Sequence, residues 1–444
     1  MKEKQLKIFE SDNLWESIFK MVIPALIAIL VMLIYNLADM IFVGQTGETG
    51  QVAAISVAGP VFNLIMAVAM LISSGGSVLI ASDLGKKDTE HARMVSSLCT
   101  WSALVLGILA GALVIIFHRP LLSVLGATED IWLYTRNYML ILAMGAPFLL
   151  LSNMFGQILR AEGAFKEGLI GNLLGTVINI ILDPLFILVF KKGVVGAAIA
   201  TVLGNMASTA YYLFYIKRKA VVLNLNPKYA LMKPTYIIAI MSLGLPNAVS
   251  TFLSGFSSSF ANKLLAVYGS DAIAANAAAG RVNLIITMLL MGICMGSQPL
   301  MSYNFGAGNR QKLSGVIKRI LILTTAAGAA ATIAVILFRS AVIGLFLKDA
   351  SVAAMSEEVL KIMMISSPFM GLFYLGTNFL QATRKATTAT FLSAMQKALL
   401  LIPLLFLLES IYGILGIRYA YVLADLLSVL VAVTLMIYNW RREV

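Results

Sequence analysis

The chain has 444 residues, of which 60% are hydrophobic and only 12% are charged. Soluble domains carry charge at about a quarter of their positions, so this composition excludes a water-soluble fold. The net charge of +12 would fit a nucleic-acid partner, but the basic residues collect in short stretches between long apolar runs. We therefore predict a protein embedded in a lipid bilayer, with no nucleic-acid partner.

The first apolar run follows a charged lead at residues 1–10. It is too long for a signal peptide and lacks a small-residue cleavage site, so we expect a retained first helix. Twelve runs of about twenty or more apolar residues follow one another, which predicts an all-α membrane protein with twelve transmembrane helices. About two-thirds of the basic residues fall in loops on one side. The positive-inside rule then predicts a multi-pass protein of a prokaryotic cytoplasmic (inner) membrane, with both termini in the cytoplasm.

The two halves of the chain repeat one pattern at a constant spacing. Residues 53–59 are echoed by residues 274–280, which lie 221 positions later. Since each half holds an even number of helices, both halves keep one orientation. This predicts two six-helix bundles related by a pseudo-two-fold axis normal to the membrane. We expect an N-lobe at 1–216, a cytoplasmic linker at 217–234 and a C-lobe at 235–444.

Carboxylates inside the predicted spans are few, and each costs about 2.5 to 3.5 kcal/mol at a helix centre. Asp39 lies near the outer end of the first span and Asp183 in the fifth. At about 1.5 Å per residue, both lie at a depth similar to that of Thr201 in the sixth span. Asp183 also belongs to a polar stripe on one helix face, which consists of Asn172, Thr176, Asn179 and Asp183.

Two carboxylates with an amide and a hydroxyl suit a hard monovalent cation or a shared proton. The candidate cation-coupling residues, which would also be the metal ligands if the ion is Na⁺, are Asp39, Asn179, Asp183 and Thr201. The C-lobe does not repeat this pair of acids, since Ile402 stands where Asp183 would. An acid pair in one lobe favours a coupling role. The alternative is a structural carboxylate satisfied by neighbouring amides and hydroxyls. Asp425 is a further acid inside a predicted span. A structural ion pair and a functional role are equally good interpretations of it.

Candidate substrate-binding residues are neutral polar or soft side chains on faces that could meet in a central cleft. Amides and hydroxyls can orient a ligand, and a methionine can adapt to its shape, although ordinary packing explains most methionines. The candidates are Tyr35, Asn36, Asn153, Gln157, Asn205, Ser257, Asn276, Asn283, Met288 and Asn378.

No catalytic machinery is evident in the sequence. There is no phosphate-binding loop of the G-x-x-x-x-G-K-[ST] type, and the chain has only two histidines. We therefore expect neither an enzyme nor a cofactor, apart from a coupling ion that is H⁺ or Na⁺.

Three segments together resemble the multidrug and toxic compound extrusion (MATE) family, in particular its DinF- and MepA-like branch. They are residues 39–44 (DMIFVG), 159–163 (LRAEG) and 179–186 (NIILDPLF). The resemblance spans essentially the whole chain and implies two six-helix lobes. It also implies export of organic, often cationic or amphiphilic, compounds against H⁺ or Na⁺, and a cation site in the N-lobe at positions matching the candidate coupling residues.

The resemblance thus predicts an antiporter for drug-like small molecules, active in xenobiotic transport and antibiotic resistance and expected to be a monomer. One alternative is a lipid-linked sugar flippase of the same superfamily, which should line its cleft with several basic residues to hold phosphates. Arg281 is the only obvious one in the sequence. A membrane enzyme or a receptor is a second alternative, disfavoured because there is no catalytic constellation or extramembrane domain. The substrates and the choice between H⁺ and Na⁺ stay open.

Overall fold

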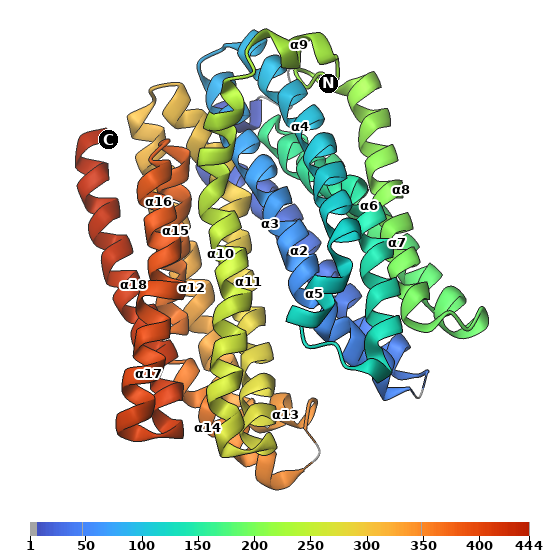
Figure 1. The fold of residues 1–444 in the computed structure, drawn as a ribbon. Coiled ribbons are helices and arrows are strands. Elements are labelled where there is room, and N and C mark those ends of the chain that lie inside the picture. The colour runs from blue at the N-terminus through green and yellow to red at the C-terminus, as the bar shows by residue number, and fades with distance from the viewer. Residues whose placement is uncertain (1–6, 47, 348, 444) are drawn as a thin grey trace. The chain divides into compact units, whose positions relative to one another are not determined.

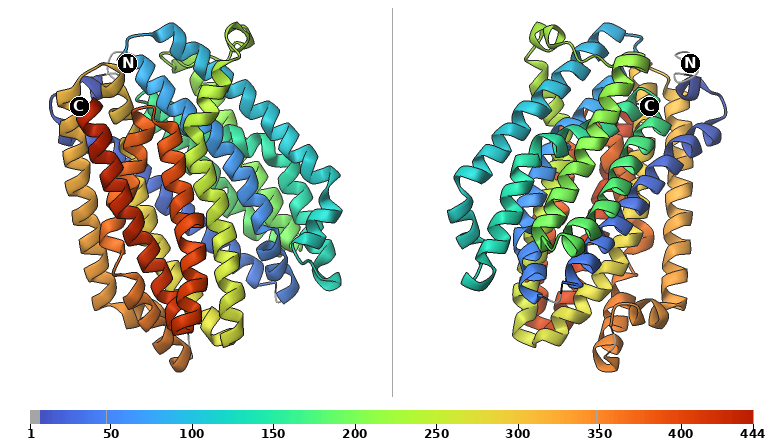
Figure 2. Two further views of the ribbon diagram at one scale, coloured as in Figure 1. Left: turned by 60° about the vertical axis from the view of Figure 1, so that its left-hand side comes forward. Right: turned by 90° about the vertical axis from the view of Figure 1, so that its right-hand side faces the viewer.

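The computed structural model describes residues 7–46, 48–347 and 349–443, except for the side chains of residues 36–41, 44, 49 and 443. Within these residues, the regular structure is entirely helical (Figure 1). Among the described residues, eleven helices are long and apolar enough to cross a membrane, and a bent helix pair gives up to a twelfth span. The predicted all-α membrane fold with twelve spans is therefore confirmed. Figure 2 shows the same helices from two further sides, joined mostly by short connections.

Contacts divide the chain into two compact units. Unit 1 contains Met1–Asp12 and Ile23–Thr251, and unit 2 contains Asn13–Val22 and Phe252–Val444. These units differ from the predicted lobes in two segments, because the start of the first helix belongs to unit 2 and the start of the seventh span to unit 1. The lobe limits at 1–216 and 235–444 remain a prediction.

The elements of unit 1 are α2 (Leu14–Gly44, from Ile23), α3 (Thr49–Gly85), α4 (Thr89–Ile116), α5 (His118–Val124), α6 (Glu129–Ala161), α7 (Phe165–Pro184), the π-helix η1 (Leu185–Val189), α8 (Gly193–Lys219), α9 (Pro227–Met232) and the first part of α10 (Tyr236–Leu265). Those of unit 2 are the rest of α10, η2 (Ala266–Tyr268), α11 (Ser270–Gly306), α12 (Arg310–Leu337), α13 (Arg339–Gly344), α14 (Ala350–Met363), η3 (Ser367–Phe369), α15 (Met370–Ala382), α16 (Ala386–Ala394), the π-helix η4 (Met395–Leu400), α17 (Leu401–Tyr412) and α18 (Ile414–Glu443).

The element boundaries of unit 2 repeat those of unit 1. Helices α3 and α11 are both 37 residues long and begin 221 positions apart, and α4 and α12 are both 28 residues long with the same offset. The first residues of α7 and α16, and of α8 and α18, keep that offset as well. The repeat predicted from short sequence motifs therefore extends to the helix boundaries themselves.

One pair of matched helices differs between the units. Helix α6 is continuous through Pro147, whereas its counterpart is broken into α14 and α15 with a bend of 41°. Pro368 removes a backbone N–H at the break, and two serines precede it. Ser366 donates to the carbonyl of Met363 at 3.3 Å, which satisfies a carbonyl that the broken helix leaves open.

Small residues set the closest helix contacts in unit 1. Helix α6 packs against α3, α4 and α8, and α7 packs against α8 (Figure 1). At the α7–α8 crossing, a Cβ on Gly175 would lie 2.6 Å from the carbonyl oxygen of Gly204, and the reverse distance is also 2.6 Å. Because neither residue has a side chain, the two backbones approach closely. This crossing lies one helical turn from Asn179 and Thr201 and so fixes their separation.

The segment predicted to be a linker is held against unit 1. Buried Glu162, at the end of α6, accepts hydrogen bonds from the backbone N–H groups of Val222 and Leu223, both at 2.8 Å. Farther along, the Trp101 indole of α4 donates to the carbonyl of Leu225 at 3.1 Å. The beginning of this segment therefore has a fixed course along the ends of α4 and α6.

Candidate functional site

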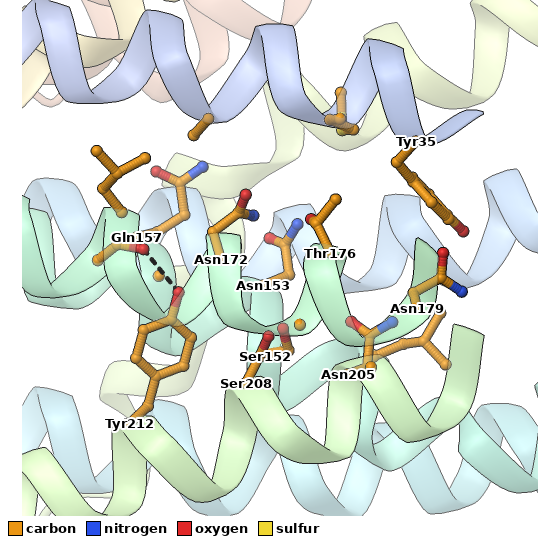
Figure 3. A pocket seen from close by; sticks show the side chains of 18 of the residues that line it. Tyr35, Ser152, Asn153, Gln157, Asn172, Thr176, Asn179, Asn205, Ser208 and Tyr212 are labelled. Atoms are coloured by element: carbon orange, nitrogen blue, oxygen red, sulfur yellow. Dashed lines mark hydrogen bonds between the residues drawn. The ribbon is translucent and has the colours of Figure 1, made fainter. Parts of the chain in front are cut away.

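A cavity of about 290 Å³ lies within unit 1, between α2, α3, α6, α7 and α8. Each helix contributes residues three or four positions apart, which is the spacing of one helix face. The polar side chains that line it are Tyr35, Ser152, Asn153, Gln157, Arg160, Asn172, Thr176, Asn179, Thr201, Asn205, Ser208 and Tyr212. Figure 3 shows most of them as sticks along the cavity. The apolar wall includes Met32, Met66 and Met70.

One end of the cavity carries three of the four predicted coupling residues. Asn179 and Thr201 line this end and are 3% and 5% exposed, and Asp183, one turn farther along α7, is fully buried. The Tyr35 hydroxyl of α2 lies 3.2 Å from the Thr201 hydroxyl oxygen, within hydrogen-bonding distance. Three helices therefore bring a carboxylate, an amide and two hydroxyls together.

The Asn179 carboxamide links the acid to α8. In the orientation that satisfies both ends of the amide, its nitrogen donates to Asp183 Oδ2 at 3.2 Å, and its oxygen accepts from the backbone N–H of Thr201 at 3.0 Å. This orientation is assigned from the hydrogen-bond network. Asp183 and Thr201 therefore share one bridging side chain.

Local sequence explains why Asp183 is placed at this end. Pro184 follows it, and the chain then changes from α-helix to the π-helix η1. Proline lacks an N–H, and π-turns in membrane helices often mark functional positions. One turn beyond Asp183, Ile187 belongs to a buried apolar cluster with Val43 and Ala197.

A loop interaction holds the helix ends near this cluster. The exposed Glu48 carboxylate, after α2, accepts hydrogen bonds from Gln51 at 2.7 Å and from the Tyr134 hydroxyl at 2.9 Å. These donors lower the pKa of Glu48, Gln51 having the larger effect. Gln51 in turn accepts from the backbone N–H of Val194, which ties the start of α8 to α3.

The fourth predicted coupling residue, Asp39, and the neighbouring candidate Asn36 lie on α2, but their side chains are outside the described residues. Their roles remain predictions. Of the predicted substrate-binding residues, four line the cavity of unit 1, namely Tyr35, Asn153, Gln157 and Asn205.

Apart from Asn36, the other substrate-binding candidates lie in unit 2 and are not part of this cavity. Ser257 is buried and donates to the carbonyl of Lys397 at 2.6 Å, and the Asn378 amide donates to the carbonyl of Tyr374 at 2.8 Å. Asn283 accepts from Ser367 at 2.9 Å. Asn276 and Met288 are half-buried on α11. The structure thus places the candidates in two groups, one in each unit.

Several lining residues were not among the sequence candidates. Asn172 and Thr176 had been seen only as part of the stripe on α7, and Ser208 and Tyr212 of α8 were missed. A signal for the α8 residues was present, because residues 201, 205, 208 and 212 have the same spacing of four, three and four as the stripe on α7. Arg160 of α6, the one charged side chain among the described lining residues, was also missed.

The ligand atoms that this end of the cavity offers an ion are the carboxylate oxygens of Asp183 and the hydroxyl oxygens of Tyr35 and Thr201, and such oxygen atoms suit a proton or a hard cation such as Na⁺. In the part of the chain that the structure describes, no group of three or more His, Cys, Asp or Glu side chains could hold a metal ion.

Comparison with known proteins gives consistent matches over the chain. The family model MatE matches residues 24–185 and 243–407. The multidrug export protein MepA of Staphylococcus aureus is 31% identical over 441 residues, covering 99% of this chain and 97% of that protein. MepA of Staphylococcus saprophyticus is 30% identical with the same coverage.

Solved structures match the fold. The Vibrio cholerae MATE transporter VcmN in its bent form has a TM-score of 0.89 at 23% identity, covering 97% of this chain and 98% of that one. A MOP superfamily transporter from Pyrococcus furiosus has a TM-score of 0.91 at 22% identity, covering 99% and 98%. At these identities, the structural likeness supports the fold.

Proposed function

The chain belongs to the MatE family of transporters, and from this premise we propose that it is a secondary antiporter that exports organic cations or amphiphiles in exchange for H⁺ or Na⁺. MepA, its relative over nearly the whole length, is a multidrug export protein. Multidrug efflux is therefore the activity that the relatives support, and the protein is a multi-pass membrane protein. The exchange for a cation, the class of substrate and the location in a cytoplasmic membrane with both termini inside belong to the proposal.

The observation that carries the proposal is the bridge from buried Asp183 through Asn179 to the wall of the cavity. A cation bound at Asp183 changes the charge that Asn179 and Thr201 face. A substrate in the cavity meets these same two residues. The two ligands therefore compete through shared side chains, and such a negative coupling between sites is reciprocal. Exchange of one ligand for the other follows when the ion and the substrate stabilise conformations that are open to opposite sides of the membrane.

The flippase alternative calls for several basic residues around a phosphate. Among the described residues that line the cavity, Arg160 alone is basic, and the rest of the polar wall consists of amides and hydroxyls. This lining fits a drug-like amphiphile better than a lipid-linked sugar phosphate. As expected for a small-molecule pocket, the wall is mixed, with methionines beside a few polar groups.

The test is transport of a fluorescent organic cation into inside-out vesicles, under pH and Na⁺ gradients imposed separately. We expect accumulation driven by one of these gradients and abolished when that gradient is collapsed. Vesicles from cells without the protein give the background. Accumulation that follows neither gradient would contradict an ion-coupled antiporter.

A further inference from the structure

A single guanidinium lies at the end of the cavity opposite Asp183. Arg160 is in the last turn of α6 and lines the cavity together with Gly168 and Tyr212. Along α7, the cavity extends from Gly168 to Asn179, which corresponds to a rise of about 16 Å. The cavity therefore has a basic end and an end next to a buried acid.

The guanidinium of Arg160 has unused hydrogen-bonding capacity. Its Nε donates to the carbonyl of Gly156 in the same helix at 3.0 Å, and no described carboxylate forms an ion pair with it. The nearby acids are engaged elsewhere, because Glu162 accepts from two backbone N–H groups and Glu167 accepts from the Tyr211 hydroxyl. The two terminal nitrogens of the guanidinium form a planar fork of donors that matches a carboxylate.

The side chains near Arg160 add to the difference between the two ends of the cavity. The Tyr212 hydroxyl donates to the carbonyl of Gly168, and the Ser208 hydroxyl donates to that of Gly171, both at 2.8 Å, so these hydroxyl protons are not offered to a ligand. The carboxamides of Gln157 and Asn172 line the same stretch and make no hydrogen bond to another described residue (Figure 3). An anionic oxygen at this end would thus meet amide donors as well as the guanidinium.

We propose that Arg160 is the receptor for a carboxylate on the substrate, so that the cavity selects zwitterionic amphiphiles over otherwise identical cations. The proposal rests on the proposed export function and names a substrate class for the same cavity. A charged guanidinium in an enclosed, partly apolar site gains most from a ligand that brings a compensating charge. The cationic part of the same molecule is then directed toward the end that carries Asn179 and, behind it, Asp183.

The probes are a rhodamine dye with a free benzoate group and the methyl ester of the same dye, which differ only in that charge. Binding of each is measured to the purified full-length protein in neutral detergent without any gradient. We expect the intact protein to bind the free acid more tightly than the ester. In Arg160→Gln, we expect the free acid to bind about 10- to 100-fold more weakly, the range for loss of a charged hydrogen-bonded pair, with little change for the ester.

Two further variants make the result specific. Arg160→Lys keeps the positive charge but not the planar fork of donors. Its affinity for the free acid should therefore lie between that of the intact protein and that of Arg160→Gln. Arg218→Gln removes an exposed arginine of α8 that stacks on Phe214 outside the cavity and should leave both dyes unaffected. Ester binding by each variant reports that its cavity is folded.

An intact protein that binds the ester as tightly as the free acid would overturn the proposal without reference to any variant. An equal loss of both dyes in Arg160→Gln and Arg160→Lys would also overturn it, since the arginine would then be structural. Added phosphatidylglycerol should not displace the free acid more than phosphatidylcholine does. Stronger displacement would assign the site to a lipid headgroup instead. Failure of gradient-driven export with binding intact would contradict the proposed function and leave this inference standing.

Discussion

At the scale of single residues, one carboxamide, that of Asn179, contacts both the buried acid and α8. A buried carboxylate is tolerated in a membrane protein when neighbouring donors compensate its desolvation. Asn179 supplies such a donor and also lines the cavity. We therefore propose that ion binding and substrate binding meet at this residue.

Asn179→Leu keeps the branching and the number of heavy atoms of the side chain but removes both hydrogen bonds. Hydrogen bonds to charged groups are worth about 1.5 to 3 kcal/mol, and loss of this donor leaves the ion-free carboxylate of Asp183 less compensated. We therefore expect the ion concentration for half-maximal transport to fall at least about tenfold. The measurement is dye transport in proteoliposomes over a series of H⁺ and Na⁺ concentrations.

Asn205→Leu is the matched control for this variant. Asn205 also lines the cavity, but its amide donates to the carbonyl of Thr201 in its own helix at 2.9 Å. Its loss should alter the affinity for dye with an unchanged ion dependence. The same ion dependence in Asn179→Leu as in the intact protein would remove Asn179 from the coupling site.

The position of several of these side chains was predictable from the sequence, because a polar stripe on an apolar membrane helix is expected to face the protein interior and not the lipid. The spacing of four, three and four placed Asn179 and Asp183 on one face of α7, and depth alone put Thr201 at their level. The Asn179 bridge was not predictable, since it depends on the rotation of α8 about its own axis. Arg160 was missed because it is at the end of a span, where a basic residue is expected for topology alone.

At the scale of helices, α3 and the first part of α10 pack so closely in unit 1 that there is no room for a side chain between their backbones. A Cβ on Gly75 of α3 would lie 1.8 Å from the carbonyl oxygen of Ile240, and one on Gly244 of α10 would lie 1.9 Å from that of Leu71. The two helices therefore touch backbone to backbone at two glycines. The amide of Asn247 donates to the Ser74 hydroxyl at 2.7 Å beside this contact.

Gly75→Ala should force α3 and the beginning of α10 apart. Overpacking of this kind typically costs about 1 to 3 kcal/mol, which we expect as a lower thermal midpoint and weaker transport. Gly59→Ala is the control in the same helix, because a Cβ there meets nothing within 4 Å. The measurement is thermal unfolding of both variants in detergent. Equal midpoints for the two variants would show that the close approach is unimportant.

The helix pattern itself was largely predictable, because twenty apolar residues can span a membrane in few ways. The internal repeat also showed which helix of one half corresponds to which helix of the other. The break between α14 and α15 was not predicted, because Pro147 at the matched position leaves α6 continuous. The units also divide α2 and α10, with Asn13–Val22 in unit 2 and α10 up to Thr251 in unit 1. An apolar pattern does not reveal which helices such a segment contacts.

At the scale of the whole molecule, the two matched units carry different acids within their helices. In unit 1, Asp183 is bridged to the wall of the cavity, whereas in unit 2 the half-buried Asp425 of α18 accepts from Gln396 at 2.9 Å and from Ser366 at 3.1 Å. The donors to Asp425 come from η4 and from the break after α14. This arrangement suits a structural role in holding the broken span, so we expect ion coupling to reside in unit 1.

The most direct test measures ion release on substrate binding by the purified protein. An organic cation is added in weakly buffered detergent while protons are followed with an indicator, and its affinity is measured over a Na⁺ series. We expect the intact protein and Asp425→Asn to release protons or to bind the cation more weakly as Na⁺ rises. Asp183→Asn should bind it with neither effect. Unchanged ion release in Asp183→Asn, or its loss only in Asp425→Asn, would contradict a coupling site at Asp183.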